Sequence, residues 1–196
     1  MFSLDGKTVF IAGGAGYLGL PVSKGFLEQG ARVVIGDINR DLIDEAQAEL
    51  GSAFPDGELL CVHLDVTDQQ AVDSTVKIII DKFGNLHALV NATFANAGKS
   101  FDELDEDDFN RANNLNITST FLLARRCASE MKNGGAIINF SSMYGIVAPN
   151  PSDYPGDLEP NPIEYGAGKA ALIQVTKYLA AHYGPNNIRV NAVAPG

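Results

Sequence analysis

The sequence predicts a doubly wound α/β fold, in which helices cover both faces of a parallel sheet. Short runs of apolar, mostly branched residues alternate with longer segments of helical spacing along the whole chain. The strand candidates are apolar at consecutive positions, which is typical of strands buried on both faces. With 196 residues, 45% of them hydrophobic, the chain fits a single domain over residues 1–196.

The elements follow one another in strict alternation. A strand is predicted where apolar residues run together between turn residues, and a helix where they recur every three to four positions. The predicted strands are residues 8–13, 32–37, 59–65, 86–91, 135–141 and 187–196. The predicted helices are residues 17–30, 40–51, 67–83, 105–133 and 164–183.

A glycine-rich turn, FIAGGAGYLGL, joins the first strand to the first helix. Gly13, Gly16 and Gly19 have no Cβ, so a pyrophosphate can approach the backbone and be stabilised by the free N–H groups of the helix N-terminus. The turn, with Tyr17 and Leu18 inside it, is therefore predicted to bind a dinucleotide. A plain tight turn is the alternative for a lone glycine triplet.

The second strand ends at Asp37, which lies 24 positions after Gly13. An acidic residue at about this distance hydrogen-bonds the ribose hydroxyls of a dinucleotide and repels a 2′-phosphate. NAD is therefore favoured over NADP as the cofactor. Arg40 could meet a phosphate, or it could simply begin the next helix in solvent.

The third strand is followed by Asp65 and Val66. These residues fall at the carboxyl end of the sheet, where ligands bind in open α/β folds, so we expect them to contact the cofactor. Thr67 or Asp68 is expected to cap the helix that follows.

The last predicted helix opens with IEYGAGKAAL. Tyr165 and Lys169 are four residues apart, so on a helix they lie on one face. A neighbouring ammonium favours the phenolate, which makes a phenol usable as a base near neutral pH. For these two residues alone, an ordinary helix pair is the alternative.

A proline-rich loop precedes this helix. Residues 148–162 hold five prolines, three acidic residues and no basic residue, which predicts an exposed loop. Loops of this length inside compact domains are usually functional or disordered.

In order behind the glycine turn, the motifs SSMYG, YGAGK and NAVAPG resemble those of the short-chain dehydrogenase/reductase family over nearly the whole chain. The resemblance implies a three-layer Rossmann fold and an NAD(P)-dependent oxidoreductase that interconverts a secondary alcohol and a ketone by hydride transfer. It makes Tyr165 the acid/base, with Lys169 tuning it and holding the ribose. Ser142 would hydrogen-bond the substrate oxygen. Asn116 matches the asparagine that holds a water linking the lysine to solvent, with a structural amide as the alternative. The remaining cofactor contacts implied are Asn91, Pro195 and Gly196, together with Tyr165 and Lys169.

The chain departs from the family pattern at four places. The spacing GxxGxxG looks like the longer branch of the family that handles sugar nucleotides. VNATF stands where NNAG is usual, which places Thr93 and Phe94 at positions of small residues. Ser142 and Tyr165 are 23 residues apart, more than is usual. The chain stops at APG, so we expect a sheet without the usual C-terminal last strand and a sequence that is a portion of a longer protein.

The extra length before the last helix predicts the substrate class. Its hydrogen-bonding groups suit a hydroxyl-rich molecule, so a sugar or nucleotide-sugar is the predicted substrate. The residues that carry these groups are Tyr144, Asp153, Tyr154, Asp157 and Glu159.

Two other functions stay open. A nucleotide-sugar epimerase or dehydratase would use the same Tyr165 and Lys169 with transient oxidation, and the glycine spacing favours it. A dinucleotide-binding subunit without turnover is compatible with the altered turn after the fourth strand. Retention of all four catalytic positions favours the oxidoreductase, because a pure binder needs no activated phenol.

Composition limits the partners and the location. The net charge of −10 without clustered Lys and Arg argues against binding to nucleic acid or anionic membranes. The N-terminus lacks a basic signal-like region, no apolar run approaches a membrane span, and Cys61 and Cys127 fit a reducing compartment. A cytoplasmic protein is expected. The three histidines have no mutual spacing suited to a metal, so no metal is expected.

By the same resemblance, a homodimer or homotetramer is expected through the helices 105–133 and 164–183. These helices carry more apolar residues than one sheet face needs. Those residues include Leu115, Phe121, Leu122, Leu172, Val175 and Leu179.

Overall fold

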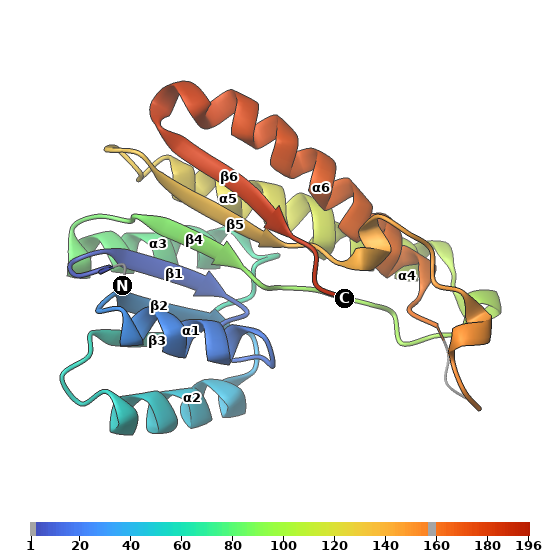
Figure 1. Ribbon diagram of the computed structural model, residues 1–196, viewed down its shortest axis with the longest axis horizontal. Coiled ribbons are helices and arrows are strands. Elements are labelled where there is room, and N and C mark those ends of the chain that lie inside the picture. The colour runs from blue at the N-terminus through green and yellow to red at the C-terminus, as the bar shows by residue number, and fades with distance from the viewer. Residues whose placement is uncertain (1–2, 157–159) are drawn as a thin grey trace.

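The computed structural model describes residues 3–156 and 160–196, and it confirms the predicted doubly wound parallel sheet (Figure 1). Among these residues, six parallel strands lie in the order β3-β2-β1-β4-β5-β6. The strands are β1 (Thr8–Ala12), β2 (Arg32–Asp37), β3 (Leu59–His63), β4 (Ala88–Asn91), β5 (Gly135–Phe140) and β6 (Ile188–Val193).

Helices connect the strands and form the outer layers. Their starts follow local chemistry: the side chains of Asn39 and Asp68 accept hydrogen bonds from the first free N–H groups of α2 and α3. The expectation that Asp68 caps a helix is therefore confirmed. The α-helices are α1 (Gly19–Glu28), α2 (Arg40–Ala53), α3 (Gln69–Phe83), α4 (Glu106–Asn113), α5 (Thr120–Ala128) and α6 (Ile163–Tyr183).

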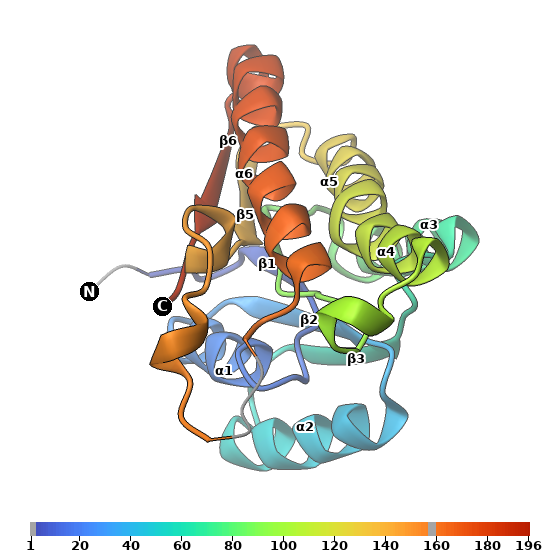
Figure 2. The ribbon, with the colours of Figure 1, turned by 90° about the vertical axis from the view of Figure 1, so that its right-hand side faces the viewer.

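The sheet separates two hydrophobic cores. Along β1, Phe10 and Ala12 pack with α3, α5 and α6, whereas Val9 and Ile11 pack with α1 and α2. Figure 2 shows these two groups of helices on opposite sides of the sheet. Alternate residues of a strand point to opposite faces, so consecutive apolar residues are required in a strand covered on both sides.

The predicted helix 105–133 differs from the structure. It is divided into α4 and α5 by a π-helical turn, η2 (Asn114–Ser119), and ends at Ala128. Within the described part of the predicted loop 148–162 lies a 3₁₀ turn, η4 (Pro151–Asp153). Other 3₁₀ turns are η1 (Phe101–Glu103), η3 (Met143–Gly145) and η5 (Gly184–Asn186). Within residues 3–156 and 160–196, no helix is both long enough and apolar enough to cross a membrane.

Candidate active site

The carboxyl ends of β1, β2, β3 and β4 surround one cleft with a volume of about 250 Å³. Five of the residues predicted to bind a cofactor line it: Gly13, Gly16, Asp37, Asp65 and Val66. The cleft lies where the strand order reverses around β1, which is where doubly wound sheets bind ligands. The other lining residues, mostly apolar and without a motif to reveal them, are Ile38, Leu42, Leu64, Ala92, Thr93, Phe94 and Leu115.

The glycine turn leaves open space at one position only. Gly13 has φ +75°, and a Cβ there would lie 2.9 Å from the carbonyl carbon of Ala92. A Cβ on Gly19 would lie 2.0 Å from the oxygen of Gly13. Gly16 is different, because a Cβ there would meet only one atom at an ordinary 3.5 Å. The turn itself therefore requires Gly13 and Gly19, whereas Gly16 leaves room for a group such as a pyrophosphate.

Asp37 holds its carboxylate at the edge of this turn. Oδ2 accepts a hydrogen bond from the N–H of Ala15 at 3.2 Å, and Oδ1 accepts one from Asn39 at 3.1 Å. Arg40 is exposed as the first residue of α2, which is the helix-start role left open by the sequence. One carboxylate oxygen of Asp65 is already hydrogen-bonded within the chain, because Oδ1 accepts from both the N–H and the hydroxyl of Thr67.

Lys169 is a buried ammonium held by backbone carbonyls. It is 3% exposed, and its Nζ donates to the oxygen of Phe140 at 2.7 Å and to that of Thr93 at 3.3 Å. Burial lowers the pKa of Lys169 from 10.5 to about 8. Its Nζ lies 5.6 Å from the ring centroid of Tyr165, and the edge of Phe94 packs against the same ring at a centroid distance of 6.2 Å.

Ser142 lies at the start of η3, which packs tightly on α6, the helix that carries Tyr165 and Lys169. The Oγ of Ser142 accepts a hydrogen bond from Tyr144 at 3.2 Å and so begins η3. A Cβ on Gly145 would lie 2.7 Å from the carbonyl carbon of Lys169. The hydroxyl of Ser141, which the sequence did not single out, donates to the carbonyl of Lys169 at 2.9 Å.

Asn116 lies in the π-helical turn and faces α6. It is 1% exposed, its Oδ1 accepts from the N–H of Ala95 at 3.0 Å, and its Nδ2 donates to the oxygen of Ala95 at 2.8 Å. A Cβ on Gly168 would lie 2.8 Å from the Cβ of Asn116, so the two elements approach closely. The side-chain amide thus has a structural partner, and the water-holding role that the resemblance implies stays a prediction. π-helical turns are frequent at functional sites.

Comparison with known proteins agrees with this geometry. The family described as enoyl-(acyl carrier protein) reductase matches residues 14–196. A 7alpha-hydroxysteroid dehydrogenase of Bacteroides fragilis is 33% identical over 201 residues, which cover 100% of this chain and 73% of the relative. A 3alpha-hydroxysteroid dehydrogenase of Mediterraneibacter gnavus is 32% identical over 195 residues, which cover 98% of this chain and 74% of the relative.

The chain belongs to the short-chain dehydrogenase/reductase family. Solved structures of this family are similar to the chain over nearly its whole length. An NAD⁺-bound xylitol dehydrogenase has a TM-score of 0.86 and 30% identity, over 98% of this chain and 70% of the other. A short-chain type dehydrogenase/reductase from Mycobacterium marinum has a TM-score of 0.87 and 28% identity, over 100% and 76%. The chain is therefore an NAD(P)-dependent oxidoreductase that acts on CH–OH groups, as the resemblance implied.

The other predicted residues of this short-chain dehydrogenase/reductase do not line the cleft. Asn91 is 2% exposed, and its amide bonds Thr120 and Thr93. Pro195 is exposed at the chain end, where its oxygen accepts a hydrogen bond from Met143 at 3.0 Å. The further predicted residues outside the cleft are Tyr17, which is 94% exposed, Leu18, which is 46% exposed, Gly19, Gly196, and Tyr165 and Lys169, which contact its lining residues Phe94 and Thr93.

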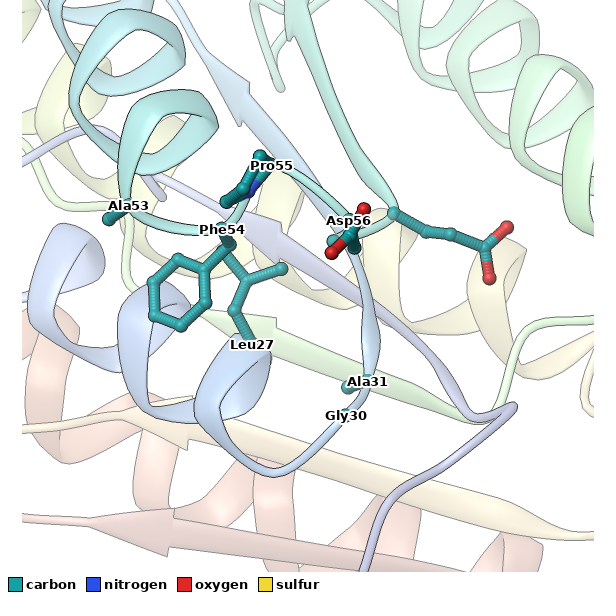
Figure 3. Close-up of a pocket in the computed structure, with 9 residues that line it drawn as sticks. Leu27, Gly30, Ala31, Ala53, Phe54, Pro55 and Asp56 are labelled. Atoms are coloured by element: carbon teal, nitrogen blue, oxygen red, sulfur yellow. The ribbon is translucent and has the colours of Figure 1, made fainter.

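Three clefts larger than this one lie elsewhere on the described part of the chain, and one of them, of about 570 Å³, lies between the end of α5 and the start of β6. Another, of about 400 Å³, opens at the amino ends of β2 and β3, where Phe54 lies beside Leu27 (Figure 3). That is the opposite end of the sheet from the expected ligand edge. The third, of about 770 Å³, is lined by residues 99–101, 144–149 and 160–163 and by one face of α6.

The cleft of about 770 Å³ opens on the face of α6 that does not carry Tyr165 and Lys169. Its α6 residues are Ile163, Gly166, Ala167 and Ala170, and a helix turns by about 100° per residue. This face is therefore turned well away from Tyr165 and Lys169. Among the described side chains, no group of three or more His, Cys, Asp or Glu is placed to hold a metal ion.

Proposed function

We propose that the chain is an NAD-preferring dehydrogenase or carbonyl reductase in which Tyr165 is the acid/base. The observation that carries this proposal is the position of the Lys169 ammonium, buried and 5.6 Å from the Tyr165 ring. An ammonium has three N–H donors, and two are taken by Phe140 and Thr93. At neutral pH, below its pKa of about 8, Lys169 keeps the charge that favours a phenolate nearby.

Five residues would hold the cofactor along the cleft: Gly13, Gly16, Asp37, Asp65 and Val66. A bound nicotinamide dinucleotide supplies the hydride acceptor or donor. Gly16 leaves room for the pyrophosphate beside the N-terminus of α1. The carboxylate of Asp37 supports NAD over NADP, because it would repel a 2′-phosphate.

Ser142 and Tyr165 would act on the substrate oxygen from two sides. The Ser142 hydroxyl donates a hydrogen bond that stabilises charge on this oxygen. Tyr165 takes the proton as its phenolate during oxidation and returns it as the phenol during reduction. Asn116 contributes by fixing the segment at Ala95 next to this pair.

The test uses cofactor binding and turnover together. Fluorescence titration with NADH and NADPH measures both affinities, and NAD reduction is followed over polyols, sugars, nucleotide-sugars and hydroxysteroids. Tyr165→Phe is expected to lower kcat by about 10²–10⁴ with NADH affinity unchanged. Tyr178→Phe, on the same helix and 69% exposed, is the matched control and should keep full activity.

Each result discriminates between the functions considered. Binding of neither nucleotide would contradict the cofactor assignment. NADH binding without net reduction of any compound would favour an epimerase or a non-catalytic binder. Full activity of Tyr165→Phe would contradict the assignment of the acid/base.

A sugar or nucleotide-sugar remains the predicted substrate. Turnover of the polyols, sugars, nucleotide-sugars and hydroxysteroids in the activity test decides between the substrate classes. The described groups of the long loop partly satisfy one another: the hydroxyls of Tyr144 and Tyr154 are hydrogen-bonded, and Asp153 accepts from Asn150 at 3.3 Å. Asp157 and Glu159, also predicted to recognise the substrate, lie outside the described residues. A xylitol dehydrogenase and hydroxysteroid dehydrogenases are both similar to this chain, which is why polyols and steroids belong in the panel.

A homo-oligomer formed through the outer faces of α4 and α6 also remains a proposal. Phe109, Ile163 and Tyr178 support it, because they are 38%, 52% and 69% exposed on these faces. The six apolar residues named from the sequence instead contact the chain's own interior, fully or in part. Light scattering on the purified chain gives the mass, and Tyr178→Lys should lower it if this face is the interface.

A further inference from the structure

A segment after β4, residues 94–99, is held at every second residue by a buried polar side chain. Two of these contacts are made to the backbone of the segment, at Ala95 and Ala97, and the third is made to the side chain of Lys99, which follows Gly98 at φ +65°. The anchors come from three elements, the π-helical turn, α6 and α4, and each is at most 3% exposed. The pairs are Asn116 with Ala95, Glu164 with Ala97, and Asp108 with Lys99.

Glu164 is the least expected of the three anchors. It is 0% exposed, lies in the first turn of α6, and immediately precedes Tyr165. Its Oε1 accepts a hydrogen bond from the N–H of Ala97 at 2.8 Å, while its Oε2 is buried without a partner among the described residues. Burying a carboxyl oxygen without a partner costs free energy, so packing alone does not explain a glutamate here.

The same segment also touches the ring of Tyr165. Phe94, at its start, packs edge-on against Tyr165 with the ring planes at 89°. Tyr165 is thus flanked by the segment twice, through the ring of Phe94 and through the bond between Ala97 and its own neighbour Glu164. These contacts place the segment against both the ring of Tyr165 and the first turn of α6 that carries it, while Asn116 separately anchors the segment at Ala95.

We propose that Glu164 is a positioning residue for Tyr165. Its Oε1 fixes segment 94–99 against the first turn of α6, and the segment holds the Tyr165 ring in the orientation needed for proton transfer. The inference rests on the proposed function, in which Tyr165 is the acid/base. A misplacement of about 1 Å at such a group costs about a hundredfold in rate.

The experiment compares two substitutions of similar volume. Glu164→Met removes the acceptor, and Glu164→Gln keeps an oxygen that can accept from Ala97. Thr176→Val is the matched control, because Thr176 lies in α6, is 5% exposed, and bonds Asn139 at 3.0 Å away from the site. The readouts are kcat, KM for NAD, and amide hydrogen exchange of Ala97 followed by NMR.

Glu164→Met should lower kcat about ten- to hundredfold, leave KM for NAD within about twofold, and speed exchange at Ala97. Glu164→Gln should recover most of the rate and the protection, while Thr176→Val should keep the kcat of the natural chain. Equal loss of kcat in Thr176→Val, or no rescue by Glu164→Gln, would overturn the proposal. So would fast exchange of the Ala97 amide in the natural chain, a result that does not depend on any variant folding.

Hydrogen exchange separates this inference from the proposed function. If Tyr165→Phe keeps its activity, the acid/base assignment fails, whatever the exchange at Ala97 shows. If Tyr165→Phe is inactive but Glu164→Met is fully active with fast exchange at Ala97, only the positioning role fails.

Discussion

At the residue scale, the position of Lys169 could be predicted from the sequence, but its hydrogen-bond partners could not. Its spacing from Tyr165 could be predicted, because i and i+4 lie on one helix face. The hydrogen-bond acceptors of its ammonium could not be predicted, because they are the main-chain oxygens of Thr93 and Phe140, and every residue type supplies such an oxygen. Glu164 escaped prediction for the same reason: a glutamate in a first helical turn is usually exposed, and its partner here is a backbone N–H.

Removal of the Lys169 charge should change the pH dependence of catalysis. In the natural chain, Lys169 loses its proton, and with it the charge that favours a phenolate nearby, as the pH rises through its pKa of about 8. Lys169→Met is therefore expected to lower kcat at pH 7 about a hundredfold and to lack the part of the pH dependence that is centred near pH 8. A pH–rate profile from pH 6 to 10.5 measures this difference, and an unchanged profile would contradict the role of Lys169.

The same substitution should affect stability with a defined sign. The folded pKa of Lys169, about 8, is below its ordinary value of 10.5, so between these values the unfolded chain binds more protons than the folded chain. The stability of the natural chain should therefore rise by up to about 3 kcal/mol from pH 8 to 10.5 through this group, relative to Lys169→Met. Urea unfolding at pH 7, 9 and 10.5 tests the trend, and a parallel pH dependence in both proteins would exclude it.

Asp37 should set the choice between NAD and NADP. Asp37→Asn keeps the shape and the oxygen that can accept from Ala15, but it removes the charge that would repel a 2′-phosphate. The ratio of NADPH to NADH dissociation constants is expected to fall about tenfold, as for a change of about 1.4 kcal/mol. Asp41→Asn, an exposed acid in the first turn of α2, is the control. Equal ratios in both variants would show that Asp37 does not discriminate.

At the element scale, the sequence did not predict the π-helical turn that divides the predicted helix 105–133. Residues 105–133 show helical spacing throughout, and one extra residue in a turn alters that pattern too little to be detected. In the structure this turn packs closely on α6, where Asn116 meets Gly168, which has no Cβ. The glycine can be noticed in the sequence, but its partner on another helix cannot.

Gly168→Ala should test this contact between elements. The added Cβ would lie 2.8 Å from the Cβ of Asn116, so α6 or the π-helical turn must shift, at a cost of about 1–3 kcal/mol. Gly25→Ala in α1 is the control: nothing lies within 4 Å of its new Cβ, and better helix propensity should stabilise it by about 0.5–1 kcal/mol. Chemical unfolding of both variants measures whether the free energy of unfolding falls in Gly168→Ala and rises in Gly25→Ala. A stable, active Gly168→Ala would show that Gly168 and Asn116 approach each other less closely than described.

At the scale of the whole molecule, alternation of elements was enough to predict the sheet and its covering. Strand order follows from right-handed crossovers, which place α1 and α2 on one face and the later helices on the other. Positions of Gly13, Asp37 and Asp65 at one cleft follow from that order, since the carboxyl ends of parallel strands share an edge. The apolar part of the cleft, such as Ile38 and Leu42, could not be predicted, because apolar residues there carry no motif.

The cleft joins four strands, so its ligand should stabilise the entire fold. It is lined from the ends of β1, β2, β3 and β4 and by Leu115 in the π-helical turn, and none of these groups keeps this arrangement in the unfolded chain. NADH at a hundred times its dissociation constant should add about 2.7 kcal/mol to the free energy of unfolding, which raises Tm by about 5–10 °C for a chain of this size. NADPH at the same concentration should raise Tm less, because of Asp37. A thermal scan at several concentrations of each nucleotide measures both shifts, and a Tm that stays constant as NADH increases would contradict binding at this cleft without reference to any substrate.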